Sequence, residues 1–296
     1  MPHRHPAQTL ATLREPDVRL RWLAEWLRQS EPIVAVGAIE EAARSAMLGQ
    51  AREFYVTFVH LLLHVRPRPD LPGGPLPPPD RRLILPDVQI AALIGAAHRE
   101  QLRWTAWLLR ECFRPPVPLD AKMLPLHGSI EKIALGVRKE RARVPNPEVV
   151  APLLVDTTPA VIQILSENPR MTEAHMQTVA TLRPTHPYAL LALLLSVKWL
   201  TNVRIVEAVA RSEAAPPWLV LALAPLLPTS VQKALANLPR IDMEVRDLLA
   251  EWLNLGDVLV AAAPRRVYEG TGVYDVADED LAQAEEWQAD AEWEAP

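Results

Sequence analysis

The feature that most constrains the fold of this chain is a long stretch without glycine. Between Gly136 and Gly256 the chain runs for 119 residues without a glycine, yet the same stretch contains twelve prolines. Proline fits the first turn of a helix but interrupts its interior, so the pattern predicts short helices separated by proline turns. Sustained alternation of apolar and polar residues, which is typical of a half-buried strand, is absent from the sequence. We therefore expect an all-α fold.

Short echoes within this stretch predict a structural repeat. Pro187-Tyr188 and Pro217-Trp218 each open a very apolar segment, 30 residues apart. Residues 169–172 (PRMT) return 70 residues later as residues 239–242 (PRID), and each copy ends on a good N-cap residue. A helix pair of about 30–40 residues buries its apolar face only by stacking on its neighbours. We expect a HEAT-like helical-repeat solenoid over residues 146–255.

Residues 1–145 have the pattern of an irregular helical region that precedes this solenoid. Helical spacing of apolar residues predicts helices over residues 17–29, 33–47, 51–65, 87–112 and 129–138. Gly95 is the expected weak point of the fourth helix. Prolines concentrate in residues 66–80 and 114–125, which predicts two loops. The third part, residues 256–296, is expected to be an acidic and flexible tail.

The net charge of −5 divides unevenly along the chain. Residues 267–296 contain ten acids and no Lys or Arg, so they carry −10 and the rest of the chain carries +5. Trp287 and Trp293 are interleaved with the acids, which favours a segment that docks on a partner or on the protein's own body. A segment that only aids solubility is the alternative that composition leaves open.

A motif between residues 124 and 253 resembles a known family. It comprises residues 124–126 (LPL), Ala134-Leu135, residues 161–165, residues 166–173 (SENPRMTE) and Arg183-Pro184. These resemble an uncharacterised bacterial family in which an N-P-R-[LM]-T-E helix start precedes R-R-P. They are also similar to HEAT-like and leucine-rich-repeat-variant helical solenoids. Residues 211–216 (RSEAAP) depart from the pattern, because the family tends to have another Asn-Pro turn there. The resemblance implies a scaffold and carries over no catalytic residue.

The pair His60 and His64 and the single residue Cys112 are the candidates for a metal-binding or reactive site. His60 and His64 share a helix face at i, i+4, but Leu61 stands where a zinc protease has its Glu, so packed histidines are the favoured interpretation. Cys112 is the single cysteine, and no histidine is an evident base for it, so a buried structural thiol is favoured. Phosphate-binding and nucleophile-elbow motifs are absent. The sequence therefore predicts no catalytic residue, no cofactor and no metal site.

The pair Trp104 and Trp107 allows two interpretations. Arginines surround the pair, so it could form a patch that stacks on nucleic-acid bases or anchors a partner. Core packing is favoured, because aromatic residues at helical spacing are usually interior.

Together these patterns predict a non-enzymatic protein–protein interaction scaffold or adaptor in the bacterial cytoplasm. The longest apolar runs are too short or too interrupted by proline to span a membrane. Arginine is enriched at interfaces, so the candidate contact residues in the solenoid are Arg170, Arg183, Arg204 and Arg211, with Trp287 and Trp293 in the tail. The alternative is a nucleic-acid-binding HEAT-like protein of the DNA-repair type, regulated by the acidic tail. The net negative charge weighs against it. An enzyme of unknown class is the third hypothesis.

Overall fold

The computed structural model describes residues 6–46, 49–66, 80–115 and 128–262. Within these ranges the chain is all-α and contains no strand, as the sequence predicts. Two of the proposed contact residues, Trp287 and Trp293, lie outside the described residues, as do most of the predicted tail and most of the two proline-rich loops. No helix in the described ranges is long and apolar enough to cross a membrane.

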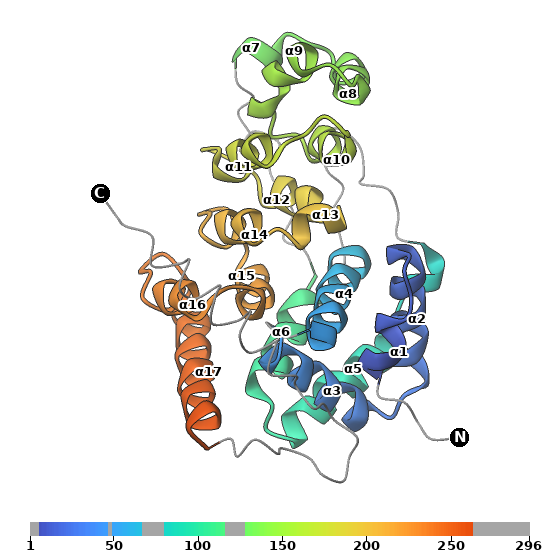
Figure 1. The fold of residues 1–296 in the computed structure, drawn as a ribbon, viewed down its shortest axis with the longest axis vertical. Coiled ribbons are helices and arrows are strands. Elements are labelled where there is room, and N and C mark those ends of the chain that lie inside the picture. The colour runs from blue at the N-terminus through green and yellow to red at the C-terminus, as the bar shows by residue number, and fades with distance from the viewer. Residues whose placement is uncertain (1–5, 47–48, 67–79, 116–127, 263–296) are drawn as a thin grey trace.

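Six helices and one 3-10 turn form the N-terminal region (Figure 1). They are α1 (Pro6–Ala11), α2 (Pro16–Gln29), α3 (Pro32–Arg44), α4 (Gly49–Val65), η1 (Arg81–Leu83), α5 (Asp87–Arg99) and α6 (Arg103–Cys112). Helix α4 packs against α1, α2 and α3, so it is the centre of this region. Its middle is buried on every side, and Phe54, Phe58 and Leu62 are almost completely buried.

The prediction of one continuous helix over residues 87–112 is wrong, because the structure has two helices there, α5 and α6. Gly95 lies inside α5 without a break, and the chain turns instead at Gln101, which has a φ of 58°. The backbone N–H of Leu102 donates to Ala97 O, and that of Gln101 donates to His98 O. These two bonds form a Schellman motif that closes α5 with a residue other than glycine.

The second region contains the remaining helices, which are short except for α17. They are α7 (Gly128–Glu131), α8 (Leu135–Arg143), α9 (Pro147–Val150), η3 (Ala151–Val155), α10 (Pro159–Glu167), α11 (Glu173–Thr181), α12 (Pro187–Leu194), α13 (Val197–Leu200), α14 (Val203–Ala210), α15 (Pro217–Leu223), η4 (Ala224–Leu226), α16 (Thr229–Ala236) and α17 (Met243–Ala262). The single helix predicted over residues 129–138 is wrong, because α7 ends at Glu131 and α8 begins at Leu135. Helix α17 runs past residue 255, where the solenoid was expected to end.

Proline marks the helix starts as predicted. Pro147, Pro159, Pro187 and Pro217 each occupy the first turn of a helix, where the missing N–H costs no hydrogen bond. Helices α12 and α15 are buried on all sides, so their apolar segments are core helices. Their apolar composition is therefore explained by burial between other helices of the protein.

These short helices lie in successive layers (Figure 1). Helix α10 packs against α8 and α12, and α11 packs against η3 and α14. The layers join the N-terminal region where α4 contacts α12 and α13, and where α6 contacts α15 and α17. One continuous hydrophobic core runs through both regions, so neither region has a separate interior.

Two hydrogen bonds from α4 cross this junction. The Tyr55 hydroxyl of α4 donates to Ala222 O of α15 at 2.9 Å. His60 Nε2, also on α4, lies 2.8 Å from Leu195 O at the end of α12. Both bonds satisfy carbonyl groups near helix ends, so they fix how α4 sits against the layers.

Candidate interaction groove

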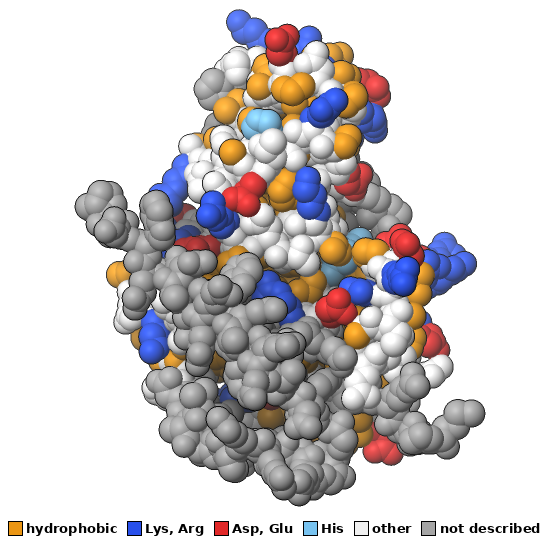
Figure 2. All heavy atoms as spheres, viewed as in Figure 1, with side chains coloured by type: hydrophobic (Ala, Val, Ile, Leu, Met, Phe, Trp, Pro, Cys, Tyr) orange, Lys and Arg blue, Asp and Glu red, His pale blue; other side chains and the backbone are white. Residues whose placement is uncertain are grey.

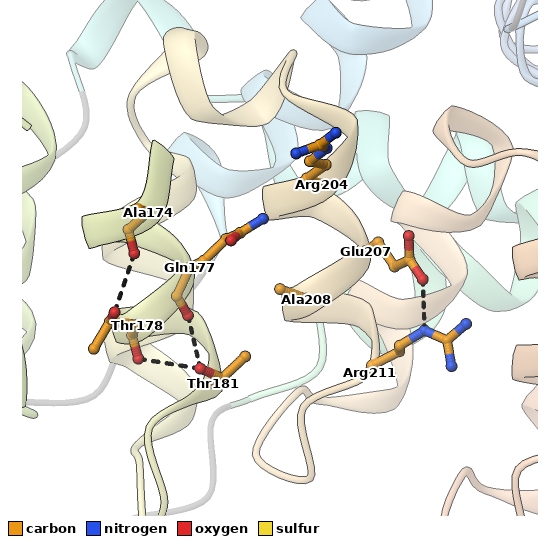
Figure 3. A pocket seen from close by; sticks show the side chains of 8 residues that line it. All are labelled: Ala174, Gln177, Thr178, Thr181, Arg204, Glu207, Ala208 and Arg211. Carbon is orange, nitrogen blue, oxygen red and sulfur yellow. Dashed lines mark hydrogen bonds and ion pairs between the residues drawn. The ribbon is translucent and has the colours of Figure 1, made fainter. Parts of the chain in front are cut away.

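An open groove of about 500 Å³ lies between α11 and α14 (Figure 3). Polar side chains and two alanines line it. They are Ala174, Gln177, Thr178 and Thr181 from α11, and Arg204, Glu207, Ala208 and Arg211 from α14 and its C-terminal end. Because Ala174 and Ala208 are small, the two helices leave a hollow between them where larger side chains would fill the space.

Helix α11 supplies one wall because its sequence is amphipathic. Met176, Val179 and Ala180 are buried, which turns Gln177 and Thr178 toward the groove. The helix begins with a capping box, in which Thr172 accepts a bond from the backbone N–H of His175 and the His175 ring accepts one from the N–H of Thr172. This cap confirms the predicted role of Thr172 and fixes where the wall begins.

Helix α14 supplies the other wall. Asn202 caps it by accepting a bond from the backbone N–H of Ile205, and Ile205, Val206, Val209 and Ala210 are buried. Arg204, Glu207 and Ala208 therefore face the groove at helical spacing, and Arg211 follows at the C-terminal end.

The two walls differ in hydrogen-bonding character. On α11 the Thr178 hydroxyl donates to Ala174 O at 3.0 Å, and the Thr181 hydroxyl donates to Gln177 O at 2.8 Å (Figure 3). Each hydroxyl has used its proton within the helix, so its oxygen is left as an acceptor. The guanidinium groups of Arg204 and Arg211 are donors only. The groove therefore offers hydroxyl acceptors and the Gln177 amide on α11, and guanidinium donors beside the Glu207 carboxylate on α14.

The charges of the groove are held in exposed ion pairs. Arg204 Nη1 lies 3.4 Å from Glu173 Oε1, and Arg211 Nε lies 2.8 Å from Glu207 Oε1. Exposed pairs of this kind contribute only about 0–1 kcal/mol, so these arginines can exchange partners at little cost.

The structure brings together two of the four arginines predicted in the solenoid. Arg204 and Arg211 line the groove. Arg183 is exposed between α11 and α12 and pairs with Glu213 at 2.8 Å, and Arg170 is exposed just before α11. The sequence interpretation missed Gln177, Thr178 and Thr181. Their signal was the polar face opposite the buried residues of α11, which becomes a wall only once α14 lies beside it.

The other candidate side chains lie in the interior or pack against it, as their sequence patterns favour. Trp104 and Trp107 are buried in the core. Cys112 is fully buried, and burial raises the pKa of its thiol to about 12, which favours the protonated thiol at neutral pH. His60 Nε2 and His64 Nε2 lie 3.1 Å apart, and burial lowers the pKa of His60. Among the described residues, no group of three or more His, Cys, Asp or Glu side chains could hold a metal ion.

Neither the protein-family models, nor the curated proteins, nor the solved structures contain a match to this chain. The protein is therefore all-helical with many short helices, and it is not assigned to a family.

Proposed function

We propose that this protein is a non-enzymatic interaction scaffold of the bacterial cytoplasm, and that the groove between α11 and α14 binds a segment of a partner protein. The groove carries the proposal because it is open, polar on both walls and built on two rigid helices. Binding sites on rigid elements hold their geometry better than sites on loops.

Contacts between successive layers support a HEAT-like repeat of about 30 residues. Asn202 Nδ2 donates to Glu173 Oε2 across 29 positions of sequence, and Arg183 pairs with Glu213 across 30. The Arg240 guanidinium donates to Arg211 O across 29 positions. Contacts that recur at one separation are expected when each layer is one repeat unit that touches only its neighbours.

The chemistry of the groove favours an extended polar segment over an apolar helix. Hydroxyl oxygens on α11 can accept from the N–H groups of such a segment, and guanidinium groups on α14 can donate to its carbonyl or carboxylate oxygens. The acidic tail, with Trp287 and Trp293, is proposed either to dock on the partner or to mask the groove when the partner is absent.

The distribution of charge favours a protein partner over nucleic acid. Lys and Arg are interspersed with Asp and Glu on the face that Figure 2 shows, and each arginine of the groove has a carboxylate beside it. Phosphate binding depends on a concentrated basic surface.

Affinity isolation of matched variants from the host cell, with quantitative mass spectrometry, tests this function. Arg204→Glu combined with Arg211→Glu is expected to lose one specific protein that the wild type recovers. Arg143→Glu is the control, because Arg143 also sits in an exposed ion pair, with Glu140 on α8. Deletion of residues 269–296 is expected to change the amount of that protein recovered. The proposal fails if the wild type and the groove variant recover the same proteins.

A mobility shift by the tail-deleted protein at low salt would instead support the nucleic-acid alternative. The proposed protein scaffold predicts no shift at micromolar protein.

A further inference from the structure

Arg66, directly after α4, holds a charged group at the junction of the two regions. Its guanidinium carbon lies 4.6 Å from the ring centre of Trp218 and 5.9 Å from that of Tyr188. Its Nε and Nη1 atoms are buried and have no hydrogen-bond partner among the described residues. The side chain is therefore a partly buried cation that lies against aromatic rings, and no carboxylate of the described ranges is paired with it.

Two other cations in the structure show what is missing at Arg66. Arg44 lies 4.5 Å from the ring centre of Trp252, and its Nη2 pairs with Glu40 Oε1 at 2.7 Å. The Lys198 ammonium lies 4.2 Å from the ring centre of Trp199 and donates to Met171 O. Each of these cations has an oxygen acceptor in addition to its ring. Within the part of the chain that the structure describes, Nε and Nη1 of Arg66 have no such acceptor, and a buried charge without a partner is costly.

Two side chains at these rings, Trp218 itself and His186 beside Tyr188, also present buried N–H groups without acceptors among the described residues. His186 caps α12 and stacks on Tyr188, with ring centres 5.4 Å apart, and its Nδ1 accepts a bond from the backbone N–H of Tyr188 at 3.0 Å. A neutral imidazole that accepts at Nδ1 carries its proton at Nε2, so His186 Nε2 is a donor. It is buried and unpaired, as is the indole N–H of Trp218.

We propose that Arg66, His186 and Trp218 form a binding site for an oxyanion, where α4, α12 and α15 meet. All three side chains offer donors and none offers an acceptor, so the group that completes them must bring oxygen lone pairs and, to balance Arg66, negative charge. Phosphate and carboxylate groups both satisfy this requirement. The site is separate from the groove between α11 and α14, and it does not depend on the proposed function.

Proton–nitrogen NMR of the full-length protein tests the site through the indole resonance of Trp218. The Trp218→Phe variant assigns that resonance, because it removes the N–H and keeps a ring. Titration with inorganic phosphate is expected to shift the peak along a saturable curve, and sodium chloride at equal ionic strength is expected not to. Acetate in a parallel titration distinguishes a carboxylate site from a phosphate site, and saturation by either one supports the proposal.

Matched variants link the peak shift to Arg66. Arg66→Met is expected to weaken binding about tenfold or more, because hydrogen bonds to a charged group are lost. Lys198→Met removes a cation that already has an acceptor and is expected to leave the affinity unchanged. If Arg66→Met does not fold, the His186 ring resonances of the wild type provide the test. A single site requires that the His186 and Trp218 resonances give the same dissociation constant for the anion. The absence of saturation with both anions, or full affinity in folded Arg66→Met, would overturn the proposal.

Discussion

Replacement of Asp156 by Asn tests how the first layers of the stack are held together. Asp156 Oδ2 lies 2.6 Å from Arg138 Nη1, and the two side chains are 0% and 6% exposed. Asp156 Oδ1 also accepts the backbone N–H of Thr158 at 2.8 Å. The pair therefore connects α8 to the turn that begins α10, inside the core.

The magnitude follows from burial. Removal of one partner of a buried pair leaves the other charge unpaired and costs about 3–5 kcal/mol. We expect a loss near the lower end for Asp156→Asn, about 3 kcal/mol, because Arg138 still donates to Ile133 O and to the Thr158 hydroxyl. Arg143→Met is the control, because Arg143 pairs with Glu140 at 2.7 Å while the two side chains are 56% and 76% exposed. Its cost is expected to stay below about 1 kcal/mol.

Urea unfolding, followed by tryptophan fluorescence and far-ultraviolet circular dichroism, measures both losses. The double variant Arg138→Met with Asp156→Leu removes both charges together and is expected to be more stable than Asp156→Asn alone. Equal losses for Asp156→Asn and Arg143→Met would refute the reasoning from burial. So would a double variant less stable than Asp156→Asn.

Three further predictions concern the core and the junction. Burial lowers the pKa of His186 to about 4, and also lowers that of His60, so the unfolded chain binds more protons below its ordinary histidine pKa near 6.5. The free energy of unfolding is therefore expected to be highest above that pH and to fall as the pH drops toward 4, and the fall is expected to be smaller in His186→Asn. Urea titrations at a series of pH values measure this dependence, and a free energy of unfolding that does not change with pH would contradict it. Tyr55→Phe is expected to cost about 1 kcal/mol in urea unfolding, because Ala222 O loses its donor, and no change would contradict this. Cys112 is expected to react with a thiol reagent only in denaturant, and rapid labelling of the native protein would contradict its burial.

Local sequence signals predicted the helix starts well. Pro187 and Pro217 do begin α12 and α15, and Thr172 does cap α11, because first-turn prolines and cap residues act on the backbone next to them. The break at Gln101 was missed because glycine, the usual residue at that position of a Schellman motif, is absent.

The sequence could not predict contacts between distant segments. The Tyr55 bond to Ala222 spans 167 positions, and the His60 contact with Leu195 spans 135, so neither leaves a local pattern. For the same reason the sequence did not predict the groove, although it named two of the side chains that line it. Arginine enrichment pointed to Arg204 and Arg211, but the second wall depends on how α11 stacks beside α14.

The measurement that tests the central claim most directly is photo-cross-linking from inside the groove. A benzophenone amino acid at position 178 replaces an exposed threonine of α11, and the same amino acid at position 88 replaces the exposed Val88 of α5 as a control. The proposed scaffold predicts that position 178 cross-links one specific cellular protein, that position 88 does not, and that Arg204→Glu with Arg211→Glu abolishes the product. Equal cross-linking from both positions, or none from position 178, would contradict the groove as the partner-binding surface.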